Sequence, residues 1–121
     1  MIDETNNIIK ECKKIIENEN LQELKEYYNT LDQDQIFISN KIPYELIFQK
    51  IFIHACNYGN KEIIEWLVEK YNEMDNVRKI ALRQLFFYGK YILKKNKKYK
   101  EDNKVIDWYE SILDKIRYIE R

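Results

Sequence analysis

The apolar residues of this chain recur with the period of amphipathic helices. A first stripe lies on one helical face and consists of Ile8, Ile9, Cys12, Ile15 and Ile16. A second stripe consists of Leu21, Leu24, Tyr27, Tyr28 and Leu31. Asn20 precedes this second stripe and Glu23 follows three residues later, as in a capping box. The pattern therefore predicts two helices with a boundary at Asn20.

The next segment, from Pro43 to Tyr58, is apolar on nearly every side, which is typical of a fully buried helix. Proline suits the first turn of a helix, so Pro43 is the predicted start. Residues 32–42 are less regular, and Ile36–Ile38 is predicted to form a short extended piece. We therefore expect a third, central helix after an irregular connection.

The only two glycines each follow a tyrosine, and each is predicted to end a helix, at Gly59 and at Gly89. Gly59 can adopt the left-handed conformation that terminates a helix, and Asn60 can then cap the next one. Along this fourth helix the predicted inward residues are Ile63, Ile64, Trp66, Leu67 and Tyr71. The predicted outward residues are Glu62, Glu65 and Glu69.

Two further helices complete the pattern. Asp75 or Asn76 is predicted to cap a fifth helix, whose inward residues are Ile80, Leu82, Leu85, Phe86, Tyr88 and Ile92. Residues 90–101 are predicted to be a charged break. The sixth helix starts near Asn103 and carries Val105, Trp108, Tyr109, Ile112, Leu113, Ile116 and Ile119. The expected fold is all-α: one domain over residues 1–121, with three antiparallel helix pairs at about 3–31, 43–72 and 76–119.

The amino-acid composition agrees with an all-helical fold and argues against a membrane or secreted protein. One proline and two glycines are too few for a sheet with many tight turns. No stretch is long and apolar enough for a transmembrane helix, and the polar start is unlike a signal peptide. We expect a cytoplasmic protein that does not enter a membrane. Cys12 and Cys56 are expected to be free, buried thiols.

The charge is balanced in total but unevenly distributed. Residues 1–35 carry nine acidic and four basic residues, whereas residues 75–100 carry one acidic and nine basic residues. The densest basic positions, and candidate anion contacts, are Lys94, Lys95, Lys97 and Lys98. Such a run can simply keep a loop solvated or favour a helix dipole. It can also contact an acidic partner or nucleic acid, so three interpretations stay open.

Catalytic chemistry finds little support in the sequence. The one histidine, His54, lies on the most apolar predicted helix. His54 and Cys56 are two residues apart, so on a helix they project to different faces. Metal-binding and phosphate-binding motifs are absent, and two glycines cannot build a phosphate loop. We therefore expect a protein that is not an enzyme and that holds no metal or cofactor.

Residues 52–67 resemble a divergent ankyrin repeat of the kind found in giant DNA viruses such as mimiviruses. The matching residues are Phe52, Ala55, Cys56, Gly59, Asn60, Glu62, Ile63, Ile64, Trp66 and Leu67. The small residues Ala55 and Cys56 would let paired helices approach closely. Upstream, Asn20, Glu23, Leu24 and Tyr27 resemble the second helix of the repeat, but Glu19 occupies the position that corresponds to Gly59.

The resemblance implies an ankyrin-like stack that binds another protein through its loop tips and the concave face of its first helices. It suggests a viral adaptor or a modulator of a host or viral protein in the host cytoplasm. The candidate partner-binding residues are Gln49, His54, Asn57, Arg83, Phe87 and Lys90. Phe87 is expected to point outward while Phe86 and Tyr88 enter the core, or else to pack on the sixth helix. The alternatives are a basic protein that contacts nucleic acid or an acidic partner through residues 75–100, and a homo-oligomer.

Overall fold

The computed structural model describes residues 2–33, 44–99 and 103–116, and every regular element within these ranges is helical. The elements are α1 (Ile2–Glu17), α2 (Leu21–Gln33), α3 (Tyr44–Tyr58), α4 (Lys61–Asn72), α5 (Asn76–Leu82), α6 (Leu85–Lys95), the 3₁₀ turn η1 (Lys97–Tyr99) and α7 (Asn103–Leu113). The all-α prediction is confirmed for these residues. The predictions for Ile36–Ile38, Pro43 and Ile119 lie outside them. No described helix is long and apolar enough to cross a membrane.

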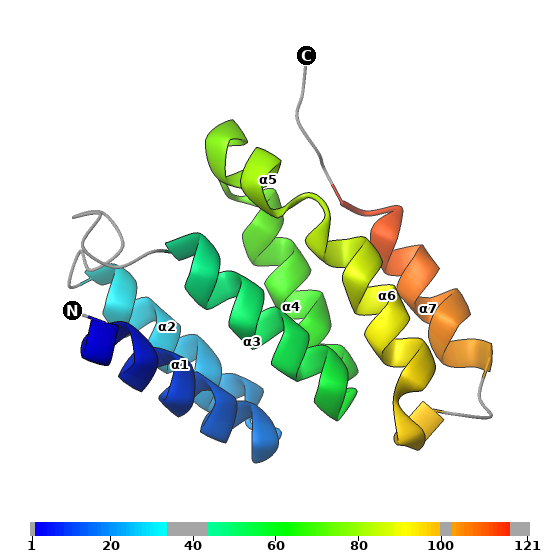
Figure 1. Ribbon diagram of the computed structural model, residues 1–121, viewed down its shortest axis with the longest axis horizontal. Coiled ribbons are helices and arrows are strands. Elements are labelled where there is room, and N and C mark those ends of the chain that lie inside the picture. Colours follow the sequence, from blue (N-terminus) through cyan, green and yellow to red (C-terminus); the bar gives the residue numbers. More distant parts are fainter. Residues whose placement is uncertain (1, 34–43, 100–102, 117–121) are drawn as a thin grey trace.

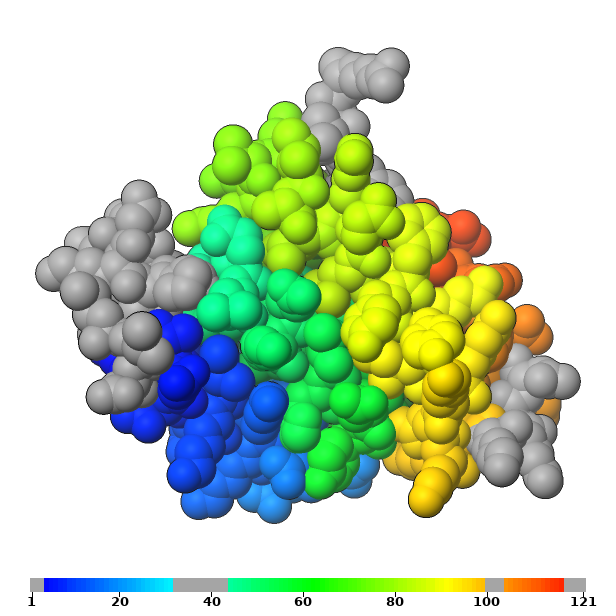
Figure 2. Space-filling model, viewed as in Figure 1, coloured from blue at the N-terminus to red at the C-terminus, as the bar shows by residue number. Residues whose placement is uncertain are grey.

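The helices form two layers. α1, α3 and α6 lie side by side with α3 in the middle, as Figure 1 shows. α2, α4 and α7 form the second layer, in which α4 contacts both neighbours. Trp66 of α4 meets the ring of Tyr28 of α2 edge to face, with centroids 5.3 Å apart. On the other side, Trp108 Nε1 of α7 donates to Glu65 Oε1 of α4 at 3.0 Å. Figure 2 looks onto α1, α3 and α6, and we call this side the front face.

An aromatic row through α3, α4 and α6 forms the centre of the core. Phe48 and Phe52 stack along α3 with centroids 6.3 Å apart. Phe86 of α6 meets Phe52 edge to face at 5.1 Å and Tyr71 of α4 at 4.6 Å. All four rings are buried, and each such pair adds roughly 0.5–1.5 kcal/mol beyond its area burial. The prediction that the third helix is the central one is confirmed.

Three helical hairpins share one spacing of buried residues. In the first helices the intervals are four, three and one residues: Ile8, Cys12, Ile15 and Ile16 in α1; Phe48, Phe52, Ala55 and Cys56 in α3; Leu85, Gly89, Ile92 and Leu93 in α6. In the second helices the intervals are four and three: Leu24, Tyr28 and Leu31 in α2; Ile64, Val68 and Tyr71 in α4; Val105, Tyr109 and Ile112 in α7. The pairs α1–α2, α3–α4 and α6–α7 therefore bury equivalent faces.

The turns of the first two hairpins use the same hydrogen bonds. Asn20 Oδ1 accepts from Glu23 N at 3.0 Å, and Asn60 Oδ1 accepts from Ile63 N at 3.0 Å. Both helix caps were predicted and are confirmed. Gly59 has φ +68°, and Glu19 has φ +53°. Glu19 thus takes the same left-handed backbone as Gly59, although a side chain is strained there.

The predicted fifth helix is in fact two helices, α5 and α6, which are separated at Arg83 and Gln84. α5 leans on α3, because the Arg78 guanidinium lies 4.3 Å from the Tyr44 ring centroid and Arg78 Nε lies 3.6 Å from Glu45 Oε1. The break changes which residues face inward. The prediction that Ile80 and Tyr88 point into the core is therefore wrong: each is 52% exposed.

The prediction that Gly89 ends a helix is also wrong, because α6 continues to Lys95. The charged break therefore begins at Asn96 rather than at residue 90. A Cβ atom on Gly89 would lie 2.5 Å from Tyr109 Oη, 2.8 Å from Phe52 Cε1 and 3.2 Å from Cys56 Sγ. The two glycines thus serve different needs: Gly59 supplies a left-handed turn, and Gly89 supplies space where α3, α6 and α7 meet.

Both cysteines are free and buried, as predicted. Cys12 lies in the first hairpin and Cys56 lies in α3 against α6. Burial, with a smaller contribution from Glu11, raises the pKa of Cys12 to about 12, and burial also raises the pKa of Cys56. Both thiols therefore stay protonated and unreactive at neutral pH.

We expect Gly89→Ala to lower the free energy of unfolding by about 1–3 kcal/mol through overpacking. Alanine is favoured over glycine inside a helix by about 1 kcal/mol, so the clash must exceed that gain. Urea unfolding followed by circular dichroism measures the change. Lys94→Ala on the exposed side of α6 is the control and should change stability by about 0.5 kcal/mol or less. A higher urea midpoint for Gly89→Ala would show that the neighbouring side chains move aside.

Candidate protein-interaction surface

The three partner-binding residues predicted on α3 differ in their surroundings. Gln49 and Asn57 are exposed. His54 is half-buried and faces α1, where its Nε2 lies 3.3 Å from Glu17 Oε2. Tyr58, one turn further along α3, donates from its hydroxyl to Glu17 Oε1 at 3.1 Å. His54 thus belongs to the contact between α1 and α3, and Gln49 and Asn57 are the accessible members of the trio.

The three partner-binding residues predicted near α6 also differ in their surroundings. Arg83 and Phe87 are exposed, and the outward direction predicted for Phe87 agrees with its exposure of 59%. Lys90 Nζ lies 2.5 Å from Glu110 Oε1 of α7. This hydrogen bond, together with the lysine charge, lowers the pKa of Glu110. Lys90 therefore joins the two helices of the third hairpin, whereas Arg83 and Phe87 are accessible.

The environment of His54 favours its neutral form. Burial lowers the pKa of His54 from 6.5, and the positive charge of Lys13 adds to this effect. The nearby carboxylate of Glu17 opposes the shift, but burial prevails. The 3.3 Å approach of Nε2 to Glu17 Oε2 lacks the alignment of a good hydrogen bond, so Nε2 is left incompletely satisfied. The site thus makes protonation of His54 unfavourable in the folded state.

The four lysines predicted as anion contacts are all exposed, but they differ in their partners. Lys98 Nζ lies 3.8 Å from Glu19 Oε1, and Lys95 Nζ lies 4.4 Å from the Tyr91 ring centroid. Lys94 and Lys97 form no ion pair within the described parts of the chain. The lysine-rich segment is therefore partly used by the fold and partly available to a ligand.

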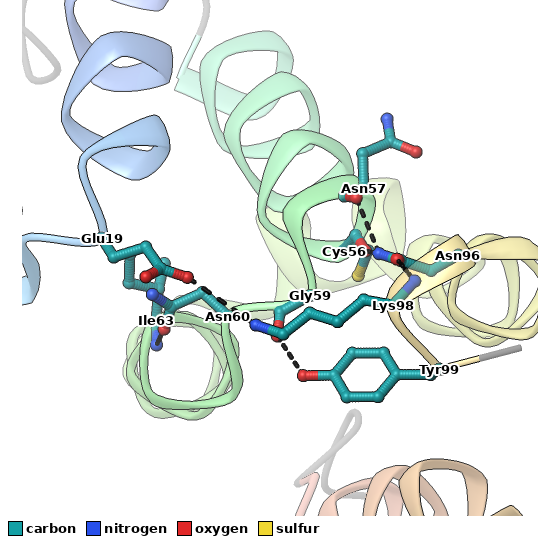
Figure 3. A network of polar contacts seen from close by, with 9 residues as sticks. All are labelled: Glu19, Cys56, Asn57, Gly59, Asn60, Ile63, Asn96, Lys98 and Tyr99. Atoms are coloured by element: carbon teal, nitrogen blue, oxygen red, sulfur yellow. Dashed lines mark hydrogen bonds and ion pairs between the residues drawn. The ribbon is translucent and has the colours of Figure 1, made fainter. Parts of the chain in front are cut away.

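Two residues that sequence reasoning missed hold this segment against α3 (Figure 3). Asn96 Nδ2 donates to the carbonyl oxygens of Cys56 at 3.0 Å and Asn57 at 2.7 Å. The Tyr99 hydroxyl donates to Gly59 O at 2.5 Å. These carbonyls close α3, where the last turn lacks partners within the helix. We call Asn96 and Tyr99 the connector latch; they are the only residues between Lys94 and Lys100 that are not lysine.

A shallow depression of about 330 Å³ lies beside the connector latch at the tips of the first two hairpins. Its charged lining consists of Glu19, Glu62, Lys61 and Lys98. Two acidic and two basic side chains give it no preference for an anion or a cation. Within the described residues, no three acidic, histidine or cysteine side chains are grouped so that they could hold a metal ion.

α6 carries a group of exposed aromatic side chains. Phe87, Tyr88 and Tyr91 are 59%, 52% and 52% exposed, and we call them the α6 aromatic cluster. Spacings of three and four residues put Tyr91 on the same side of the helix as both others. The rings of Tyr88 and Tyr91 stack with centroids 6.2 Å apart and planes inclined by 23°. The cluster is therefore an ordered apolar surface rather than a set of scattered residues.

Comparison with known proteins gives no relative from which a role could be transferred. No family model matches the chain, and neither the curated proteins nor the solved structures contain a significant match.

The His54 environment predicts a pH-dependent stability. His54 accepts a proton in the unfolded chain at a pH at which it is still neutral in the folded protein. The free energy of unfolding should therefore fall as the pH drops through 6.5, and level off once folded His54 is also protonated. His54→Gln should remove this slope between about pH 7.5 and 5.5, measured by urea titration. The same slope in His54→Gln would assign the titration to another group.

The connector latch predicts a second change in stability. Asn96→Ala leaves two backbone carbonyls without their donor, so unfolding should become easier by about 1–3 kcal/mol. Asn57→Ala is the matched control, because the side chain of Asn57 points away from the network (Figure 3) and only its backbone takes part. Thermal and urea unfolding measure the stability of both variants. Equal stability of the two variants would mean that water replaces the Asn96 amide.

Proposed function

We propose that this chain is a non-enzymatic protein-binding module, built as a short ankyrin-like stack of three helical hairpins. Three structural features support the proposal. The hairpins bury residues at equivalent positions, the turns at Asn20 and Asn60 have the same hydrogen bonds, and the first helices lie side by side as one layer. Stacks of this kind present an extended face made by one helix of each unit.

The observation that carries the proposal is the α6 aromatic cluster. Single exposed apolar residues are normal, but a contiguous exposed group marks a surface for another molecule. Tyrosine and phenylalanine are also enriched in the buried centre of protein interfaces. Two of the predicted contact residues are exposed nearby: Arg83 just before the start of α6, and Gln49 on the neighbouring α3. The front face of α3 and α6 is therefore the proposed binding surface.

A nucleic-acid role for residues 75–100 has less support. Several of the basic residues here are engaged within the fold: Arg78 pairs with Glu45, Lys90 with Glu110 and Lys98 with Glu19. Lys79 is buried, with its Nζ 5.8 Å from the Tyr71 ring centroid. Nucleic-acid affinity grows with the number of phosphates that are neutralised, and engaged side chains contribute little. A role as a viral adaptor in the host cytoplasm rests on the resemblance of residues 52–67 to viral ankyrin repeats.

A site-specific crosslink tests the proposed surface. The photoreactive residue p-benzoylphenylalanine is placed at Tyr91, and in a control at the exposed Glu69 of α4 in the other layer. After illumination in cells that express the chain, we expect protein adducts from position 91 and not from position 69. Phe87→Ala should reduce the adducts about tenfold, as for a central interface aromatic, while thermal stability changes by about 0.5 kcal/mol or less.

Two results would contradict the proposal. Equal adducts from positions 91 and 69 would show that the front face has no special role. Loss of the adducts together with unfolding of Phe87→Ala would show that the α6 aromatic cluster is structural.

A further inference from the structure

The structure also indicates what kind of partner the α6 aromatic cluster accepts. We infer that the cluster binds an acidic peptide segment, in which apolar side chains are flanked at both ends by aspartate or glutamate. This inference rests on the proposed function and specifies its partner. It follows from the charges around the cluster and from their positions along α6.

The chain segment around the cluster is basic and has no acidic residue of its own. From Asn76 to Tyr99 the chain has eight basic residues and no acidic residue. Carboxylates from elsewhere in the chain pair with Arg78, Lys90 and Lys98, and Lys79 is buried. The exposed Arg83, Lys94 and Lys95 form no ion pair among the described residues, although the charge of Lys94 helps to lower the pKa of Glu110. They are therefore the charges that a ligand would meet.

These three charges lie at the two ends of the cluster. Arg83 lies at the C-terminal end of α5, two residues before α6 begins at Leu85. Lys94 and Lys95 follow Tyr91 by one turn. The length of α6 between the two charged ends is roughly 16 Å at about 1.5 Å per residue. The arrangement is an apolar centre with a cationic group on either side.

A ligand that fits this arrangement has an apolar middle and a few separated negative charges. A carboxylate at Lys95 would lie beside the Tyr91 ring, which Lys95 Nζ already approaches to 4.4 Å. The carboxylates of the two ends would be about five residues apart in an extended peptide or about eleven in a helix. The charges would mainly speed association and select the partner, while the aromatic rings would supply apolar contact.

Two other occupants fit the arrangement less well. A second copy of the chain that packed α6 against α6 about a two-fold axis would bring Lys94 and Lys95 against the same basic helix. The bases of a single strand would stack on the rings of the cluster, but its phosphates recur at every nucleotide, whereas the basic groups here stand only at the two ends. An acidic peptide matches both the apolar centre and the charged ends.

Selection from a random peptide library tests the inference directly. Peptides of about 16 residues span the charged ends in either conformation. We expect yeast-displayed peptides selected on the immobilised wild-type chain to carry an apolar core with acidic residues on both sides. The double substitution Lys94→Glu and Lys95→Glu should shift the selected pool from acidic to neutral or basic. As a charge-matched control, Lys10→Glu with Lys14→Glu changes exposed positions of α1 and should leave the pool acidic.

Binding measurements on one selected peptide complete the test. Fluorescence polarisation should show about tenfold weaker binding when the aspartates and glutamates of the peptide are replaced by asparagine and glutamine. The double substitution Lys94→Gln with Lys95→Gln in the protein should cause a similar loss of affinity. Circular dichroism confirms that each variant is folded. A pool without acidic excess, no enriched pool, or equal binding of the amide peptide overturns the inference. Stronger binding of a single-stranded oligonucleotide than of the peptide also overturns it.

The crosslinking experiment separates the two levels of the proposal. Adducts from position 91 combined with a pool that lacks acidic residues would retain the protein-binding module and reject the acidic partner. Absence of both adducts and enriched peptides would reject the module itself.

Discussion

The close approach of three helices around Gly89 is the constraint on which the third hairpin depends. Phe52 and Cys56 of α3 and Tyr109 of α7 converge on a position where no side chain fits. The Tyr109 hydroxyl also donates to Phe86 O at 2.5 Å, so α7 is held to the backbone of α6 at the same level. With this side of α6 committed to the core, Phe87, Tyr88 and Tyr91 face away from it. The packing at Gly89 therefore positions the proposed binding surface.

The helical period and the capping residues were sufficient to predict most elements. Asn20, Asn60 and Asp75 each cap a helix through a side-chain oxygen, and such caps depend on residues only three positions away. The break between α5 and α6 has no such signal. Arg83 and Gln84 keep helical backbone angles, and Gln84 makes no side-chain cap. A bend of this kind is set by what α5 and α6 pack against, so Ile80 and Tyr88 were placed on the wrong face.

The remaining differences arise from contacts between distant parts of the chain. A glycine can supply either a turn or space, and only the position of Tyr109 shows that Gly89 supplies space. Likewise, Asn96 bonds to carbonyls 39 and 40 residues away, which no local pattern reveals. For the candidate surface, spacing on one helix left two positions for Phe87, outward or against the sixth helix, and its exposure of 59% shows the first. The spacing could not show that His54 and Lys90 meet carboxylates of neighbouring helices.

The two buried thiols can report local opening of the fold, because each becomes reactive only when the helices around it separate. Cys12 belongs to the first hairpin, and Cys56 lies where the second hairpin meets the third. Contacts between packed helices can open locally without global unfolding. Opening of the contacts that α1 makes with α2 and α3 would expose Cys12, and opening of the contact between α3 and α6 would expose Cys56. The rates at which the two thiols react with an alkylating reagent would therefore show which of these helix contacts opens more often.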